Sequence, residues 1–147
     1  LGGPKGEHFT QSLQSLNAEY NEDVSSIIWR KLLINVAINP IAAICGVKNG
    51  ELSNEPLLSQ SESTMLEAAG VARNLGINLP DDPELIQDLH SVLHYTSENE
   101  CSMLADVKAG RETEIDALCG QVVSRGESLG VPTPLNSMLL SQIKALR

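Results

Sequence analysis

Apolar residues recur at the three- and four-residue spacing of amphipathic α-helices along most of the chain. Turn-forming residues separate these runs: Gly46 suits the left-handed end of a helix, and Asn49-Gly50 suits a turn. Strand signals are almost absent, so the pattern predicts an all-α fold. The predicted helices cover residues 9–18, 23–44, 54–76, 82–95, 103–108, 113–130 and 134–146.

The helix predicted at 23–44 is the longest, and we expect it to be central to the fold. Asp23 offers an N-cap for it. Pro40 lies inside this helix. Because proline lacks an N–H and its ring clashes with the carbonyl of Val36, we expect a bend or break near Pro40. Charged and polar residues interrupt the apolar run 27–44, so we expect no membrane-spanning segment.

Size and composition indicate one compact domain. The chain has 147 residues, of which 41% are hydrophobic and only 3% aromatic, which favours an aliphatic core. Lys and Arg number 10 against 19 Asp and Glu, giving a formal net charge of −9. Such a balance repels phosphate backbones and anionic lipids. We therefore expect no nucleic-acid partner and no membrane partner.

The cysteines and histidines indicate neither a disulfide framework nor a metal site. Cys45, Cys101 and Cys119 have no Cys-x-x-Cys spacing and no accompanying signal peptide. We expect reduced thiols in a cytoplasmic protein, serving as small core side chains rather than nucleophiles. His90 and His94 have the i, i+4 spacing of a metal pair but no well-placed third ligand. We interpret them as ordinary helix residues.

A polar row on the longest predicted helix is the first candidate for chemistry. Lys31, Asn35 and Asn39 follow one another at intervals of four residues, within ~80° of arc on one face of an apolar helix. Asparagine is a mediocre helix former, so this row indicates a use beyond solvation. A lysine beside neutral amides and apolar walls suits a proton donor to a carbonyl, since desolvation lowers an ammonium pKa.

A second polar cluster covers residues 97–106 and 110–116, which include two predicted helix starts. Free backbone N–H groups at a helix start suit an anionic ligand. A carboxylate such as Glu114 at a helix start is kept ionised by the helix dipole. The two clusters together indicate a site for a small polar anion.

Three ordered motifs resemble the helical C-terminal domain of ketopantoate reductases, and they cover roughly four-fifths of the chain. Three motifs in order are much harder to obtain by chance than one. They are Trp29-Arg30-Lys31-Leu32-x-x-Asn35-x-x-x-Asn39-Pro40 with Asn49-Gly50-Glu51-Leu52, then Ser102-Met103-Leu104-x-Asp106 with Arg111-x-Thr113-Glu114-Ile115-Asp116, and Gly130-Val131-x-Thr133-Pro134-x-Asn136.

The resemblance implies an NADPH-dependent 2-dehydropantoate 2-reductase, which reduces a 2-keto acid in pantothenate biosynthesis. Lys31 would then be the catalytic general acid at the keto oxygen. Glu114 would be a second catalytic residue that helps to orient substrate and cofactor. Asn35, Asn39 and Asn99 would hold the substrate's hydroxyl and carboxylate, and Ser102 would bind the carboxylate.

The resemblance also implies a domain organisation of the 6-phosphogluconate dehydrogenase C-terminal-like type. Residues 1–8 would be the linker from a Rossmann domain that this chain lacks, and residues 9–147 the helical substrate-binding and catalytic domain. Gly2-Gly3-Pro4 has the wrong pattern for a dinucleotide turn. We therefore expect the main NADPH site on an N-terminal Rossmann partner domain, no reductase activity from this chain alone, and a possible homodimer.

Two alternatives remain open. A helical interaction or dimerisation module could keep the fold without the chemistry, but it would have little reason to retain Lys31, Asn35, Asn39, Ser102 and Glu114 together. A reductase of the same family could act on a different 2-keto acid. The sequence separates this second alternative poorly, because the residues that bind the keto acid would be shared.

Overall fold

The computed structural model describes residues 24–146. These residues form α-helices joined by short connections and include no strand. The all-α prediction is therefore confirmed for the described part, whereas the helix predicted at 9–18 lies outside it. The elements are α2 (Val24–Cys45), the 3₁₀ helix η2 (Asn49–Ser53), α3 (Leu57–Asn74), α4 (Asp82–Tyr95), α5 (Ser102–Lys108), α6 (Cys119–Leu129) and α7 (Pro134–Ala145).

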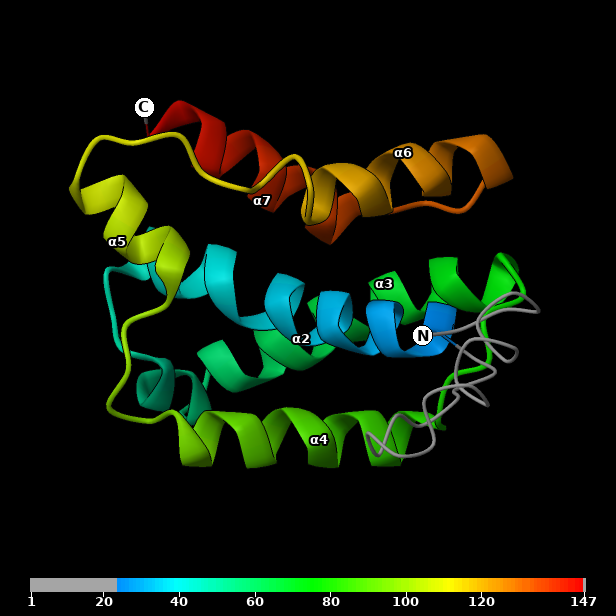
Figure 1. The fold of residues 1–147 in the computed structure, drawn as a ribbon, viewed down its shortest axis with the longest axis horizontal. Helices are drawn as coiled ribbons and strands as arrows, with labels where there is room; N and C mark the ends of the chain where they lie inside the picture. Colours follow the sequence, from blue (N-terminus) through cyan, green and yellow to red (C-terminus); the bar gives the residue numbers. More distant parts are fainter. Residues whose placement is uncertain (1–23, 147) are drawn as a thin grey trace, which may run out of the picture.

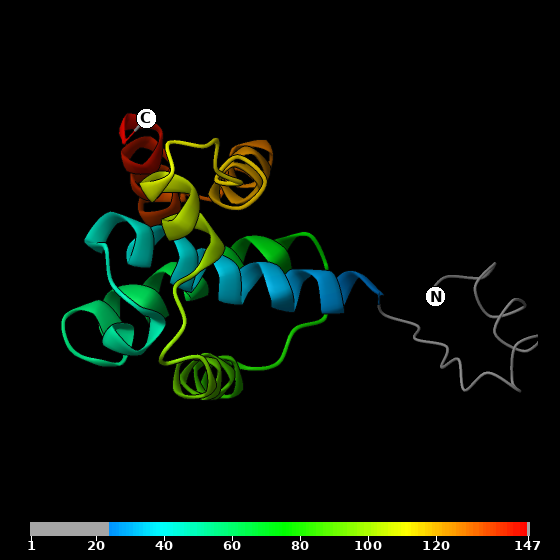
Figure 2. The same ribbon diagram turned by 60° about the vertical axis from the view of Figure 1, so that its left-hand side comes forward.

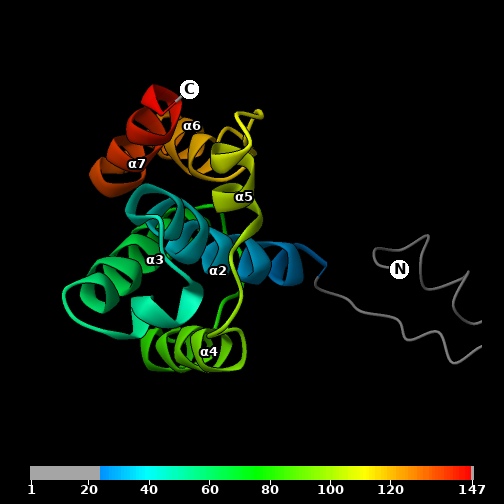
Figure 3. The ribbon, with the colours of Figure 1, turned by 90° about the vertical axis from the view of Figure 1, so that its left-hand side faces the viewer.

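Helix α2 runs through the middle of the molecule, as expected. In Figure 1, α6 and α7 lie on one side of it and α4 on the other, while α3 lies beside it. The views in Figure 2 and Figure 3 place the short α5 against the C-terminal half of α2. The core packs α2 against α3, α5 and α7. It is aliphatic, with Trp29 as its one aromatic residue among those described.

The expected break at Pro40 does not occur. Helix α2 continues without interruption from Val24 to Cys45 with Pro40 inside it. Both neighbours of Pro40 along the helix are deeply buried, Asn39 at 8% exposed and Ile41 at 1%. Tertiary packing on both sides of the proline therefore holds the helix together where local chemistry disfavours it.

By its length and its mean hydropathy of 1.5, α2 could cross a membrane, although polar residues interrupt its apolar run. In the fold, however, 56% of its most apolar window is buried against other helices. The central helix of a compact domain meets the same criteria, because it is covered by neighbours on most sides.

Helix α6 begins later than predicted. We expected its start near Thr113 and Asp116, but the segment before Cys119 forms turns, in which the N–H groups of Ala117 and Leu118 donate to the carbonyl of Glu114. Glu114 therefore does not lie at the start of an α-helix. The Thr-x-x-Asp pattern of a capping box is too weak a signal to fix a boundary by itself.

Of the three cysteines, Cys101 and Cys119 are buried, as expected of core side chains. The interpretation of Cys45 was wrong: it is the last residue of α2 and is exposed. Its apolar neighbours belong to the buried side of the helix, and Gly46, with φ of 68°, turns the chain away just after it.

Helix α7 is fixed to α3 by the part-buried carboxylate of Glu67. Glu67 accepts hydrogen bonds from the backbone N–H groups of Leu135 and Asn136, at 3.0 and 2.8 Å, and from the Asn136 amide at 2.9 Å. These donors lie in the first turn of α7, where helix N–H groups lack intrahelical partners. The preceding loop also packs tightly, since a Cβ on Gly126 would lie 2.7 Å from Thr133 Cγ2. The third sequence motif therefore serves packing.

Replacing Glu67 with Ala should destabilise the fold. The variant leaves the N–H groups at the start of α7 without their acceptor, and we expect a loss of about 2 kcal/mol in the free energy of unfolding. Urea unfolding should show a lower midpoint with an unchanged slope. Glu127→Ala on the exposed side of α6 is the matched control and should stay within about 0.5 kcal/mol. Equal midpoints for the two variants would contradict this role of Glu67.

Candidate functional site

A polar cleft of about 440 Å³ lies beside the central helix. All six residues that the sequence analysis assigned to a site line it, although they come from separate parts of the chain. The surrounding residues are a mixture of aliphatic and polar side chains. The lining residues are Lys31, Ile34, Asn35, Ile38, Asn39, Asn49, Val92, Thr96, Asn99, Glu100, Cys101, Ser102 and Glu114.

Helix α2 contributes Lys31, Asn35 and Asn39, so the polar row predicted from their spacing faces one cleft. Their burial increases along the helix, from exposed Lys31 to Asn39 at 8% exposed. We had expected Lys31 to be desolvated by apolar walls. In the structure, however, Lys31 is exposed, because it lies at the open end of the row and no described residue covers it.

Glu114 links two other site residues. Its Oε1 accepts from the Asn39 amide at 3.4 Å and from the Ser102 hydroxyl at 3.3 Å. Both distances are at the long end for hydrogen bonds, so these contacts are weak. The carboxylate is exposed and lies in the turn before α6. Side-chain donors from α2 and α5 therefore orient Glu114, in place of the helix dipole that we had expected.

The loop that carries Asn99 is held against the 3₁₀ helix η2. The backbone N–H groups of Asn49 and Gly50 each donate at 3.0 Å, to the carbonyls of Asn99 and Ser97 respectively. The approach at Gly50 is close, because a Cβ there would lie 2.9 Å from Ser97 Cβ and from its carbonyl oxygen. Glycine is thus needed at position 50 to bring Asn99 to the cleft.

Asn49 is a cleft residue that the sequence reasoning missed. We interpreted Asn49-Gly50 as a turn, yet Asn49 is only 7% exposed, lines the cleft and leaves its side-chain oxygen without a partner among the described residues. A buried asparagine with a free acceptor is a candidate ligand group. Its place within the first family motif was the signal that could have found it.

Cys101 supports the cleft as a neutral thiol. It caps α5 by accepting from the N–H of Leu104 at 3.4 Å, and its Sγ donates to the carbonyl of Asn39 at 3.6 Å. Burial is the main cause that raises the pKa of Cys101, so the thiol keeps its proton near neutral pH. It is therefore a structural residue between α2 and α5, as the sequence analysis expected.

A second hollow of about 370 Å³ adjoins the cleft along α2 and α4. The two share Lys31, Ile34, Asn35 and Val92 as lining residues. On the far side of Lys31 the walls are largely apolar, and the ion pair between Arg30 and Asp88, 2.5 Å apart, lies at the same hollow. The lining residues beyond the shared four are Arg30, Leu33, Met65, Leu85, Asp88 and Ser91.

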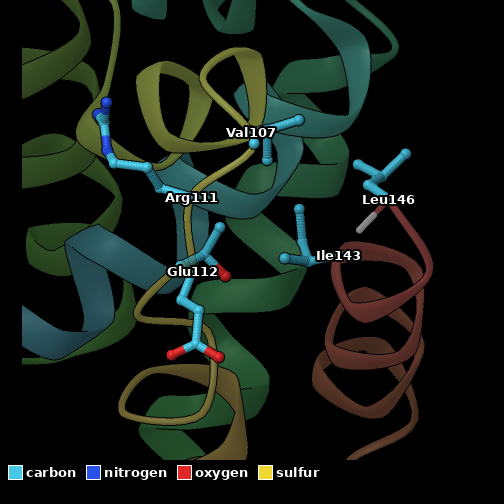
Figure 4. Close-up of a pocket in the computed structure, with 7 residues that line it drawn as sticks. Val107, Arg111, Glu112, Ile143 and Leu146 are labelled. Atoms are coloured by element: carbon cyan, nitrogen blue, oxygen red, sulfur yellow. The ribbon is translucent and has the colours of Figure 1, made fainter.

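Other features outside the cleft have simpler interpretations. A hollow of about 160 Å³ lies between α5 and α7. Figure 4 shows that Val107, Ile143 and Leu146 face one another there while Arg111 extends away. None of the six expected site residues lines it. His90 pairs with Glu62 at 2.6 Å. Among the residues that the structure describes, no cluster of three His, Cys, Asp or Glu side chains is arranged to hold a metal ion.

The helices and their cleft define the described part of the chain as an all-α domain with a polar, small-molecule-sized cleft. Residues 23–147 match the family described as "Ketopantoate reductase PanE/ApbA C terminal". The chain therefore belongs to the ketopantoate reductase family and forms its C-terminal helical domain. The resemblance found in the three sequence motifs is confirmed.

The relatives agree with this assignment. The chain is 33% identical over 132 residues to a 2-dehydropantoate 2-reductase of Archaeoglobus fulgidus, covering 89% of this chain and 44% of that protein. A PanE/ApbA family ketopantoate reductase from Ralstonia eutropha JMP134 has a similar structure, with a TM-score of 0.81, 31% identity, and coverage of 87% of this chain and 43% of that one.

A third similar structure is that of a D-mandelate dehydrogenase in a ternary structure with NADH and anilino(oxo)acetate. It has a TM-score of 0.86 and 28% identity, and it covers 98% of this chain and 50% of that one. The chain thus spans about half the length of the proteins that it matches.

The thiols should differ sharply in reactivity. Burial raises the pKa of Cys119 to about 12 and also raises that of Cys101, whereas Cys45 is exposed. A thiolate is the reactive form, so at pH 8 only Cys45 should react rapidly with Ellman's reagent. We expect one fast thiol per native chain, three in denaturant, and none fast in Cys45→Ser. Rapid reaction of either remaining thiol in the native Cys45→Ser chain would contradict the burial of Cys101 and Cys119.

Proposed function

We propose that this chain is the substrate-binding half of a two-domain enzyme that reduces 2-dehydropantoate to pantoate with NADPH. The observation that carries the proposal is the single cleft that gathers a cation, amides, a hydroxyl and a carboxylate from α2, η2, the start of α5 and the turn at Glu114. A small hydroxylated keto acid requires this combination: a proton donor for the ketone and partners for its hydroxyl and carboxylate.

In this proposal Lys31 is the general acid. Its ammonium hydrogen-bonds the keto oxygen and gives it a proton as the carbonyl carbon gains a hydride, so that the ketone becomes a secondary alcohol. Asn35, Asn39 and Asn99 hold the substrate hydroxyl and carboxylate, and Ser102 donates to the carboxylate. Glu114 orients these donors and meets the cofactor. The lining of one cleft by all six residues supports these roles.

The described residues could bind only a small part of a dinucleotide cofactor. Glu114 is an exposed acceptor at the cleft and suits a ribose hydroxyl. The described part contains no strand that could lead into a glycine-rich turn for a pyrophosphate. NADPH, when bound, supplies the hydride, and most of its binding groups would belong to an N-terminal nucleotide-binding domain. Reduction then requires both domains.

Exposed apolar surface supports a covering domain. Ile27 and Ile28, one turn before Lys31 on α2, are 53% and 61% exposed. Lys31 itself is exposed. A partner domain seated over this end of α2 would remove both features by excluding water from the general acid and from the apolar side chains.

A second candidate function is reduction of a different 2-keto acid. It is favoured by the largely apolar hollow that adjoins the cleft at Lys31, which could receive a larger substituent of the keto carbon. The similar D-mandelate dehydrogenase structure holds anilino(oxo)acetate, which carries an aromatic ring. The non-catalytic module has no comparable support, because the complete set of cleft residues is retained.

Replacing Lys31 with Ala in the two-domain enzyme should lower kcat for 2-dehydropantoate by a factor of roughly 10²–10⁴, the usual contribution of a positioned acid. Steady-state kinetics with NADPH would measure it. Asn35→Ala and Ser102→Ala should act more on KM, since those residues bind substrate. Lys144→Ala, at an exposed lysine paired with Asp116, is the matched control and should leave both constants unchanged. Near-normal turnover of Lys31→Ala would exclude Lys31 as the acid.

The two candidate substrates can be separated by one comparison. If 2-dehydropantoate is the substrate, its kcat/KM should exceed that of phenylglyoxylate by at least about 10²-fold, the scale of discrimination that pocket contacts provide. Ser91→Trp narrows the adjoining hollow at an exposed rim position without altering the six site residues. It should leave 2-dehydropantoate reduction unchanged. A higher kcat/KM for phenylglyoxylate, lost in Ser91→Trp, would establish the second candidate instead.

A further inference from the structure

The ammonium of Lys31 has no partner among the residues that the structure describes. Lys31 is exposed at the open end of the polar row, and within the described part it forms neither an ion pair nor a hydrogen bond. A general acid needs this freedom, because an ammonium that is bound to a carboxylate directs its N–H groups there and not at a keto oxygen. Carboxylates close to Lys31 must therefore be kept from binding it.

Three carboxylates line the two hollows that meet at Lys31, and each of them has another partner. Asp88 lines the hollow between α2 and α4, whereas Glu100 and Glu114 line the polar cleft. Glu100 pairs with Lys108 at 2.6 Å, and Lys108 is not a lining residue of the cleft. Glu114 accepts from side-chain donors of α2 and α5. The remaining carboxylate, Asp88, depends on the neighbour of Lys31 in the sequence.

Arg30 is that neighbour, and it holds Asp88. Its Nη2 atom lies 2.5 Å from Oδ2 of Asp88 and 3.9 Å from Oε1 of Glu84, both on α4. Arg30, Lys31 and Asp88 line the same hollow of about 370 Å³. The guanidinium of Arg30 thus neutralises the one carboxylate residue that shares this hollow with the Lys31 ammonium.

The chemistry of the two cations explains which of them takes the carboxylate. A guanidinium is always protonated and presents a planar fork of donors that matches a carboxylate, whereas a lysine ammonium is a strongly hydrated point charge on a flexible stem. Without the charge of Arg30, Lys31 would be the only cation among the residues that line this hollow. Coulombic attraction would then draw its ammonium towards Asp88 and α4.

We propose that Arg30 is a positioning residue for the general acid: it neutralises Asp88 and so leaves the Lys31 ammonium free to reach the keto oxygen. The inference rests on the proposed reductase function and adds a residue that lies outside the six of the cleft. The site uses the charge of Arg30, so the loss of this charge matters only while Asp88 keeps its own.

The test measures kcat and KM for 2-dehydropantoate in the two-domain enzyme with NADPH. Arg30→Gln leaves Asp88 free to bind Lys31, so kcat should fall about tenfold. KM should change by less than about threefold, because the amides and the hydroxyl that bind the substrate are unaltered. Arg30→Lys keeps a positive charge beside Asp88 and should retain kcat to within about threefold of wild type.

A second substitution separates this role from a contribution of the ion pair to folding. Asp88→Asn breaks the same ion pair but also removes the competing charge. Combined with Arg30→Gln, it should restore kcat to within about threefold of wild type, and alone it should leave kcat near the wild-type value. Arg73→Gln is the matched control: it breaks the ion pair of Arg73 with Asp82, 2.7 Å long and outside both hollows, and should leave kcat unchanged.

The outcomes are distinct. A lower kcat in Arg30→Gln that Asp88→Asn reverses supports the positioning role. An unchanged kcat in Arg30→Gln overturns it, and so does an equal loss in Asp88→Asn alone, since the ion pair would then serve the fold. A wild-type enzyme that does not reduce 2-dehydropantoate, or near-normal turnover in Lys31→Ala, overturns the proposed function itself, which neither of the other results does.

Discussion

The central helix has to be buried along most of its length while one row of its side chains stays open to a cleft. Leu33, Val36 and Ala37 are fully buried, yet Asn35 and Asn39 between and beyond them line the cleft. The apolar sides of α2 are covered by α3, α5 and α7. The polar row is not covered by these helices, because the cleft opens beside it, towards the C-terminal end of α4. Asn99, Ser102 and Glu114, the site residues outside α2, line the same cleft as this row.

The helical spacing of residues in the sequence was sufficient to predict which site residues on a single helix lie together. Since residues four apart share a face, the spacing of Lys31, Asn35 and Asn39 alone was enough to group them. Residues that reach the cleft through tertiary contacts could not be grouped in this way. Asn49 lies in a 3₁₀ turn with no periodicity, and its burial comes from the Asn99 loop. Glu114 was first singled out as a carboxylate at a helix start, and that placement was wrong because α6 starts five residues later; its role at the site came from the resemblance.

Of the three motifs that identified the family, two contribute residues to the cleft and one serves the packing of the fold. The first two meet at the cleft, where Asn39 and Ser102 both reach Glu114. The third motif is remote from it, because the donors of Asn136 are used by Glu67 and the loop before α7 packs against Gly126. Position within a family motif therefore gives membership of the family. The hydrogen-bond partners are needed to show whether a residue serves a site or the fold.

Charge in the cleft explains how an acidic domain could receive an anionic substrate under the proposed function. Among the described lining residues Lys31 is the one cation, against Glu100 and Glu114. Glu100 is paired with Lys108 at 2.6 Å, which leaves Glu114 as the carboxylate that competes with a substrate. It holds its two donors only weakly, at 3.3 and 3.4 Å.

Under the proposed function, a substrate carboxylate would take those donors, the Ser102 hydroxyl and the Asn39 amide, because charge-assisted bonds of normal length would replace long ones. The Oε1 atom of Glu114 is then released from both side chains and can accept from another donor. Hydroxyl groups of a ribose supply such donors. If the proposed function holds, substrate and cofactor would in this way be coupled through one carboxylate, and binding of either would change which hydrogen bonds Glu114 can accept from the other.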